Sequence, residues 1–411
     1  MNNYSLFFVA LAILFSSSLF GQISYKLDYS KYKPGEQRYR FLNYGFNAEA
    51  SKRSFFGVQL DYNSFRNTAN RQTEISFSGG LKSIESPGLS FDFNFLHRSR
   101  FYFSKKHPLL FIPSELGVSR ESLGTQVVYT NTELRLASGI GLGRISILNE
   151  VDIAERMVEK LEAIKGSVGY KEKLTFQLAD FLAEVKNERF ITNRGSWKDE
   201  IELIETKLIE LGYMLTQEQI EKLVKETYGR ESLIRREQGN TLSLLGGYNW
   251  GRVPNDFKDR NNSGRSFGVV AESKNYLGSK WQLNHNLSLR YTDANESVNR
   301  LSLSDFVITE FEMINIDFSS KLHYMPDLDT RFSIGLSGGY QRVFNYRVTT
   351  IDDTFRLPSY DEHLSGTKIQ LELDYEKRIK RNLAASIGLD LGYSTIEDIG
   401  PLVNLRFRLR F

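Results

Sequence analysis

The last eleven residues, Pro401-Leu402-Val403-Asn404-Leu405-Arg406-Phe407-Arg408-Leu409-Arg410-Phe411, decide the fold. Apolar residues occupy every second position from Val403 to Phe411, and Asn404 and three arginines stand between them. Side chains of a β-strand point alternately to opposite faces, so this segment predicts a strand between an apolar and an aqueous environment.

The same alternation returns along most of the chain. It recurs in the segments 89–95, 281–291, 314–324, 332–340, 369–375 and 383–393. Many of these runs are ten residues or longer, whereas strands of soluble proteins usually have about five or six residues. Strands of about ten residues, tilted near 45°, span the apolar part of a membrane.

The composition of the two faces separates a membrane barrel from a soluble sandwich. The polar face combines Gly, Ser and charged residues, and the apolar face often ends in Tyr, Trp or Phe, as at Trp281 and Tyr291. Aromatic residues at strand ends are typical of the interfacial girdles of membrane barrels. Because backbone polar groups need partners in lipid, such strands close on themselves. We therefore predict an all-β transmembrane antiparallel β-barrel.

Overall composition limits the functional classes. The 411 residues include 53 Lys and Arg, 50 Asp and Glu, 29 Phe, 21 Tyr and no Cys, with a net charge of +3. A chain without Cys forms no disulfide and no Cys-ligated metal site. The near-neutral balance gives no overall basic surface for nucleic acid. We expect no nucleic-acid partner and no cofactor.

The N-terminus has the pattern of a cleaved secretory signal. An apolar run from Leu6 to Phe15 is followed by small residues up to Gly21, although the first five residues contain no Lys or Arg. Cleavage after Ser18 or Gly21 fits, and we place the signal peptide at 1–21. The alternative, an uncleaved anchor helix, needs about 20 apolar residues, and this run is shorter.

These features resemble the Gram-negative outer-membrane β-barrel proteins as a general class. The resemblance rests on the signal-like N-terminus, the absence of Cys, the alternating strands and the final strand ending in Phe411. It implies outer-membrane localisation, contact with outer-membrane lipid, and recognition of Phe407, Leu409 and Phe411 by the barrel assembly machinery.

We expect about fourteen strands, with twelve or sixteen as alternatives, centred near residues 44, 60, 77, 94, 113, 138, 246, 270, 287, 318, 338, 371, 388 and 406. Short turns at 278–279, 326–329 and 380–382 alternate with polar segments at 253–263, 293–305 and 349–363, which we predict to be long outer loops. The barrel then comprises 22–148 and 240–411.

Residues 149–239 interrupt the strand pattern with helical spacing. Four apolar stripes recur at three- and four-residue intervals, and Asn149 is a candidate N-cap of the first. Thr216 and Gln219 have the spacing of a capping box. The segment is more acidic than basic. We predict an inserted helical domain, periplasmic by the alternation of short and long connections, or extracellular if the count is off by one. It serves as a contact surface for a periplasmic protein, as a lumenal plug, or as a solvated bundle without a partner.

Charged residues on the polar face are candidates for lining the lumen. An arginine ladder at Arg406, Arg408 and Arg410 is accompanied by acidic residues on nearby strands, Asp390, Glu372 and Asp374. Such a ladder acts as a selectivity filter for anions or as an ion-pair network that fills a closed barrel.

Gly139, Gly141 and Gly143 recur every second residue inside a predicted strand. A phosphate-binding loop needs uneven spacing and a helix directly after it, so we interpret them as a bare lumenal stripe that a bulky group approaches closely. That group is the helical insert or a set of lumenal aromatic or Arg side chains.

Catalytic and metal sites have weak support. His323 shares its face with Ser319, but four residues along a strand is too far for a direct hydrogen bond. The acidic residues at 352–353 and 361–362 lack the regular spacing of a calcium loop. We assign no catalytic or metal residue.

The leading prediction is a non-enzymatic outer-membrane barrel that acts as a pore or as part of an export or surface assembly. The alternatives are a barrel enzyme of the lipase or protease type, with a site at His323 or His363, and a purely structural membrane anchor.

Overall fold

The structure is a computed structural model. It describes residues 37–50, 55–68, 70–84, 88–103, 110–124, 128–166, 169–192, 197–228, 235–254, 258–300, 306–327, 329–349, 354–356, 365–380, 383–395 and 402–410. The predicted signal peptide at 1–21, the acidic residues at 352–353 and 361–362, His107, His363 and Phe411 lie outside these residues.

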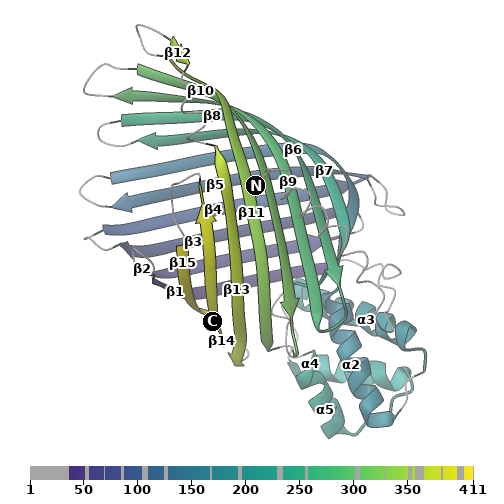
Figure 1. Cartoon of the computed structure of the whole chain (residues 1–411). Coiled ribbons are helices and arrows are strands. Elements are labelled where there is room, and N and C mark those ends of the chain that lie inside the picture. The colour runs from purple at the N-terminus through teal and green to yellow at the C-terminus, as the bar shows by residue number, and fades with distance from the viewer. Residues whose placement is uncertain are drawn as a thin grey trace.

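Long antiparallel strands make up most of the described chain (Figure 1). The strands before the helices are β1 (Gln37–Ala50), β2 (Phe55–Asn67), β3 (Arg71–Ile84), β4 (Gly88–Tyr102), β5 (Leu110–Gly124) and β6 (Val128–Ile147). Those after the helices are β7 (Glu237–Pro254), β8 (Lys258–Tyr276), β9 (Trp281–Arg300), β10 (Phe306–Tyr324), β11 (Thr330–Thr349), β12 (Thr354–Arg356), β13 (Gly366–Lys380), β14 (Leu383–Ser394) and β15 (Leu402–Arg410).

Within the described residues, these strands belong to one 15-stranded sheet in which neighbours in sequence are mostly neighbours in space. β1 pairs with both β2 and β15, and β10 pairs with both β9 and β11. The hydrogen-bonded order therefore returns to its starting strand. The short β12 pairs only with the end of β11 and stands outside that order.

Each strand centre predicted from the alternation falls within a strand of the structure. The predicted outer loops at 253–263 and 293–305 are wrong, because β7 continues to Pro254, β8 begins at Lys258, and β9 reaches Arg300. The side chains there are mostly polar, so the apolar alternation that indicates a strand is missing from the sequence. Backbone pairing between strands needs no apolar side chain. β12, inside the predicted loop 349–363, was also not anticipated.

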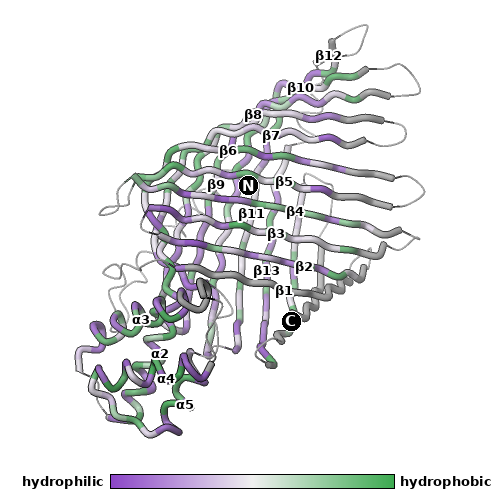
Figure 2. The backbone as a smooth tube through the Cα atoms, turned by 180° about the vertical axis from the view of Figure 1, so that it is seen from behind, coloured by the Kyte–Doolittle hydropathy of each residue, from purple (hydrophilic) through white to green (hydrophobic). Residues whose placement is uncertain are grey.

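Apolar and polar residues alternate along the strands (Figure 2), and many of the large apolar side chains are exposed. On β7 and β9, Leu244 and Leu289 are 55% and 46% exposed, although they belong to long regular strands. Their sequence neighbours Ser243 and Ser288 instead line an internal cavity. A large exposed apolar surface on every side is costly in water and is what a lipid-facing barrel requires.

Aromatic side chains gather toward both ends of the apolar band. At the end near the helices, the ring centroids of Trp281 and Tyr324 are 4.4 Å apart, and those of Phe332 and Tyr375 are 4.9 Å apart. Toward the other end, the centroids of Tyr291 and Phe344 are 6.3 Å apart. Ten residues separate Trp281 from Tyr291 along β9. At about 3.3 Å per residue and a tilt near 45°, they span about 23 Å, close to the height of the apolar band of outer-membrane barrels.

The helical segment between β6 and β7 forms a compact group at one end of the strands (Figure 1). Its helices are α2 (Asn149–Lys165), α3 (Lys171–Thr192), α4 (Trp197–Glu210) and α5 (Gln217–Glu226). Leu161, Leu178, Leu208 and Leu223 belong to one buried cluster contributed by all four helices. In the part of the chain that the structure describes, no helix has the length and apolar character needed to cross a bilayer.

One of the two predicted helix caps is confirmed and the other is wrong. Thr216 and Gln219 form the predicted capping box of α5. Asn149 is not the N-cap of α2, because Leu148 holds that position and the Asn149 side chain accepts a hydrogen bond from the backbone N–H of Arg236 at 2.7 Å. The nearby strand end competes for the asparagine side chain, and this contact is invisible in the local sequence.

Replacing Leu289 by Arg should destabilise the protein in a bilayer by about 2–4 kcal/mol, because the charge would face lipid near the middle of the band. Asn286→Arg on the same strand is the matched control, since Asn286 lines the internal cavity. Denaturant unfolding from lipid vesicles measures the difference. Equal loss of stability in both variants would contradict the assignment of faces.

Candidate functional site: the closed end of the lumen

The inward face of β3 to β9 surrounds a polar cavity of about 430 Å³. Side chains of both charges line it, among them Arg98, Glu115, Glu272, Lys274 and Arg290. At the end near the helices, Ile145, Ile147, Arg235 and Glu237 also contribute to the lining. Because these four residues flank the helical segment, the cavity is bounded there by the ends of β6 and β7.

The ends of β6 and β7 separate from the wall of the barrel. Pairing of β6 with β5 ends at Leu142, and pairing of β7 with β8 ends at Gly239. Beyond these points, residues 144–147 pair only with β7, and residues 237–238 pair only with β6. We call this two-stranded segment, 144–147 with 237–238, the β6–β7 tip.

Glycines occupy the positions at which the tip leaves the wall. Gly143 and Gly239 have φ of +94° and +129°, which residues with a side chain rarely adopt. A Cβ atom at Gly143 would lie 2.1 Å from the Asn240 carbonyl oxygen, and one at Gly239 would lie 2.0 Å from that of Arg144. The bend into the tip therefore requires glycine on both strands.

Three amide side chains on β1, β2 and β3 hold the tip across the lumen. Gln72 donates to the Ile145 carbonyl at 2.6 Å, and Gln37 donates to the Ile147 carbonyl at 3.4 Å. Asn67 lies between them, donates to Gln37 at 3.0 Å and accepts from Gln72 at 3.2 Å. Gln37, Asn67 and Gln72 are almost completely buried. We call these three residues the amide clasp.

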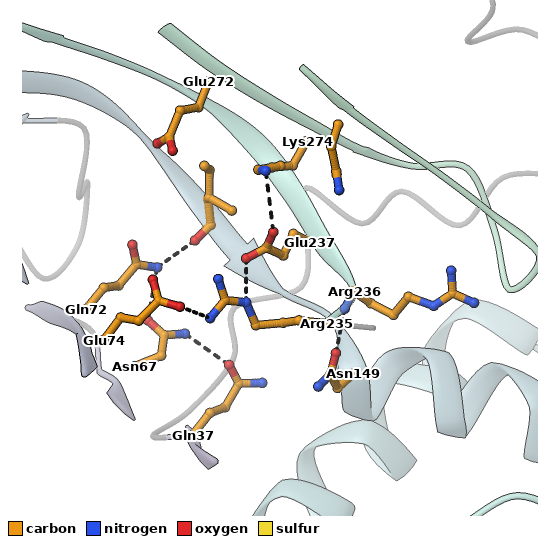
Figure 3. A network of polar contacts seen from close by, with 12 residues as sticks. Gln37, Asn67, Gln72, Glu74, Asn149, Arg235, Arg236, Glu237, Glu272 and Lys274 are labelled. Carbon is orange, nitrogen blue, oxygen red and sulfur yellow. Dashed lines mark hydrogen bonds and ion pairs between the residues drawn. The ribbon is translucent and has the colours of Figure 1, made fainter. Parts of the chain in front are cut away.

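Charged residues add contacts beside the clasp (Figure 3). The Arg235 guanidinium lies 3.3 Å from Glu74 on β3 and 2.6 Å from Glu237. Burial lowers the pKa of Arg235, but the two carboxylates outweigh it and raise that pKa above its ordinary value. The guanidinium thus stays charged and ties residue 235 to β3.

A second bridge crosses the lumen between β4 and β8. Arg100 forms an ion pair with Glu272, and Glu272 also accepts a hydrogen bond from Thr241 at 3.0 Å. The two strands are four positions apart in the sheet order, so this ion pair spans the cavity and does not follow the wall. The lumen is therefore narrowed by side chains as well as by the tip.

Arg236 points the opposite way from Arg235, toward the helices (Figure 3). Its guanidinium lies 3.4 Å from the Asp152 carboxylate of α2, and both side chains are fully buried. It also donates to the Ser279 carbonyl in the turn between β8 and β9. The Tyr276 hydroxyl joins the same group, with Asp152 at 3.0 Å and Glu155 at 2.9 Å. The first two turns of α2 are thus fixed to the β8–β9 side of the barrel.

The three glycines of the predicted stripe have different surroundings. A Cβ at Gly141 would lie 2.3 Å from the Phe111 ring, which is completely buried, and one at Gly139 would lie 1.8 Å from the Leu244 carbonyl oxygen. Gly143 lies at the bend where β6 leaves the wall. The Tyr102 ring lies 5.4 Å from Phe111. The structure thus places aromatic side chains against Gly141, and neighbouring backbone against Gly139 and Gly143.

The predicted selectivity residues divide into two groups. Lys321 on β10 binds Glu372 at 2.8 Å and Asp374 at 2.9 Å, and Asp390 is buried opposite Glu372 on β14. For the arginine ladder and the assembly signal, the structure describes backbone only: Arg406, Phe407, Arg408, Leu409 and Arg410 lie in β15, and their side chains are outside the description. The acidic members lie on the wall, away from the clasp.

His323 has a serine partner, but not Ser319. Its Nδ1 lies 2.8 Å from the Ser333 hydroxyl on the neighbouring strand β11, and both residues are buried. Ser333 faces Asp374 on β13, but the Asp374 carboxylate binds Lys321. His285 is almost completely buried on β9. Among the described residues, no group of three His, Asp or Glu side chains is placed to hold a metal ion.

The tip and clasp were not predicted from the sequence. The sequence shows Gly143 and Gly239 on the two sides of the helical insert, and Arg235 and Arg236 directly before the returning strand. The clasp itself joins residues more than 70 positions apart, and no local pattern relates them.

No family model and no curated protein matches the chain. Solved structures of similar fold include CdiB from Acinetobacter baumannii, with 7% identity and a TM-score of 0.38 over 90% of this chain and 60% of that one. The translocator domain of the autotransporter NalP from Neisseria meningitidis has 8% identity and a TM-score of 0.33, over 98% and 95% of the two chains. The KdgM porin has 8% identity and a TM-score of 0.28, over 90% and 98%. These are Gram-negative outer-membrane β-barrels, and this chain resembles that class in fold.

Arg236→Met should destabilise the junction of barrel and helices by about 2–3 kcal/mol, less than the loss of an only partner would cost, because the buried Asp152 carboxylate loses one of its two cations and keeps Arg156. Lys171→Met is the matched control, since Lys171 and Glu162 form an exposed pair that contributes at most about 1 kcal/mol. Denaturant unfolding followed by circular dichroism at helical wavelengths measures both. Similar stability of the two variants would show that the buried pair does not anchor the domain.

Proposed function

We propose that this protein is a non-enzymatic outer-membrane β-barrel of fourteen wall strands, with a periplasmic helical domain, and that it serves transport or export across the membrane. The observation that carries the proposal is a polar lumen inside an apolar outer face, which, among the described residues, the tip and lumenal side chains obstruct at the helical end. A purely structural anchor needs no polar lumen of this kind.

The charge and packing of the lumen support passage of solute or polypeptide more than catalysis. The His323–Ser333 pair has the spacing of a base and a nucleophile, but Lys321 and Arg331 lie near it, and the Asp374 carboxylate opposite Ser333 binds Lys321. A general base needs a partner that stabilises its protonated form, and nearby cations do the opposite. The enzyme alternative therefore receives no support from this pair.

The position of the helices supports a periplasmic location. They lie at the barrel end that also holds the start of β1 and the short turns β2–β3, β8–β9 and β10–β11. In bacterial barrels the short turns face the periplasm. We propose that the helical domain meets a periplasmic protein there, and that outer-membrane lipid and the barrel assembly machinery are the remaining partners.

Labelling of single cysteines tests the sidedness, since the chain has no native Cys. Tyr170→Cys, at a position 90% exposed between α2 and α3, should react with a membrane-impermeant maleimide only after the outer membrane is permeabilised. Thr395→Cys, exposed at the opposite end of the barrel, is the control and should react on intact cells. The reverse pattern would place the helical domain outside the cell.

Conductance in planar bilayers tests the transport function. We expect the refolded mature protein to conduct weakly, and a variant with residues 149–234 replaced by a short Gly-Ser linker to conduct steadily, because that variant loses the contacts of Glu150 with β1 and of Asp152 with the end of β8 that reinforce the closed tip. Absence of conductance in both forms would contradict a transport lumen. Equal steady conductance in both would show that the insert does not obstruct it.

A further inference from the structure

We propose that the β6–β7 tip and helix α2 form a single gate, which closes the lumen at the helical end and opens by swinging about the β8–β9 side. The gate would transmit an event on the helical domain to the lumen. This inference deepens the proposed transport function and rests on it.

The tip and α2 form one continuous body. The Leu148 N–H donates to the Arg236 carbonyl at 2.8 Å, so strand-like pairing continues to the residue that precedes the helix. Asn149, the first residue of α2, binds the backbone N–H of Arg236 at 2.7 Å. No linker separates the helix from the tip, and a movement of α2 therefore carries the tip with it.

The attachment of this body to the wall is narrow and has glycine on both strands. Wall pairing stops at Leu142 on one strand and at Gly239 on the other, next to the bend at Gly143. Glycine reaches backbone conformations that other residues avoid, so two such residues at the base of a two-stranded segment are suited to a hinge. Few residues need to change conformation for the tip to turn away from the lumen.

The contacts on the two sides of the gate differ in kind. On the β8–β9 side, charged side chains that are fully buried bind the wall: Arg236 donates to the Ser279 carbonyl, and the Tyr276 hydroxyl donates to Asp152. Arg236 and Asp152 both belong to the gate, so the ion pair between them joins its two parts.

On the β1–β3 side, the two clasp contacts to the tip backbone, from Gln72 to Ile145 and from Gln37 to Ile147, join neutral groups. The clasp also has charged partners, since Gln37 donates to the Glu150 carboxylate and Asn67 accepts from Arg144. Hydrogen bonds between charged groups are about twice as strong as neutral ones. The clasp side therefore releases first, and the β8–β9 side serves as the pivot.

Charged contacts on the clasp side do not change which side of the gate releases first. Arg235 and Glu74 are 30% and 34% exposed, and Arg144, which donates to the Thr68 carbonyl at 2.8 Å, is half-buried. Water reaches these groups and replaces their partners when the tip moves, so their net contribution is small. Gln37 links both parts of the gate to β1, because it also binds Glu150 of α2 at 2.8 Å.

Arg235 and Arg236 connect the two functions of the gate in consecutive residues. Arg235 belongs to the lining of the lumen and Arg236 to the contact with α2. A rotation of α2 on the pivot therefore displaces Arg235 from Glu74 at the same time. The helical domain is thereby in a position to control the lumen without entering it.

A reversible cross-link in the full-length protein tests the gate. Asn67→Ala with Gln72→Ala, which we call the clasp variant, should raise the open probability in planar bilayers by about tenfold or more over the unchanged protein, since several hydrogen bonds of the closed state are lost. Adding Glu74→Cys and Arg235→Cys to the clasp variant places one thiol on the wall and one beside the tip. Joining them with a reducible bismaleimide should abolish the openings, and reduction should restore them.

The matched control joins two wall residues. Arg98 and Glu115 lie on the neighbouring strands β4 and β5, 2.9 Å apart at their charged ends, so Arg98→Cys with Glu115→Cys in the clasp variant takes the same cross-linker without touching the tip. Openings should persist after this cross-link. Circular dichroism of each variant verifies that the barrel is folded.

The possible results separate the two proposals. Conductance that is the same before and after the Glu74–Arg235 cross-link overturns the gate and leaves the transport function standing. Loss of conductance with both cross-links also overturns it, because the effect would then come from bulk in the lumen. Absence of conductance in every form overturns the gate and the transport function together.

Discussion

Backbone pairing in lipid is the constraint on which the rest of this structure depends. An amide or carbonyl that faces hydrocarbon has no water to bind, and leaving it unpaired costs several kcal/mol. The strands of the wall meet this constraint by pairing on both sides, with β1 against β15 and β10 against β11. The requirement holds only at the height of the apolar band. Below that height the chain is free to leave the wall, and it does so at Gly143 and Gly239.

This freedom explains why the site lies where it does. The ends of β6 and β7 extend past their neighbours and need other partners for their backbone groups. Side-chain amides of Gln37 and Gln72 supply them for the Ile147 and Ile145 carbonyls. Amide side chains both donate and accept, so the three of them form a chain along the paired ends of β1, β2 and β3, facing the tip. The closed end is thus a consequence of strand length, two glycines and a few polar residues.

The sequence predicted the wall well and the site poorly, for a physical reason. Alternation of apolar and polar residues is a local consequence of facing lipid on one side, and it located each wall strand, from the segment around Tyr44 to that around Arg406. It failed where both faces are polar, as in β7 and β8 beyond the band. The capping box at Thr216 was local and was found, whereas the asparagine at 149 was assigned to a local cap but binds Arg236.

Contacts across the lumen produce no periodic pattern in the sequence. Gln72 and Ile145 are joined because closure of the barrel brings β3 opposite the tip, and only the strand order shows this. The glycine stripe was a partial signal, since its regular spacing concealed three different roles. Nothing in the sequence indicated that Lys321 binds Glu372 and Asp374, because these contacts join β10 to β13, which are not neighbours in the sequence.

The two sides of the tip differ in how deeply their charged groups are buried. A buried ion pair is stable only with further hydrogen bonds, and here the Tyr276 hydroxyl donates to Asp152 while Arg236 donates to the Ser279 carbonyl. Such a group is costly to separate and therefore fixes position. Neutral amides bordering a polar cavity exchange protein partners for water at a much smaller cost. Fully buried charged contacts with the wall lie on the β8–β9 side, whereas neutral contacts to the tip backbone and partly exposed charges predominate on the β1–β3 side. The proposed gate therefore releases more easily on the β1–β3 side.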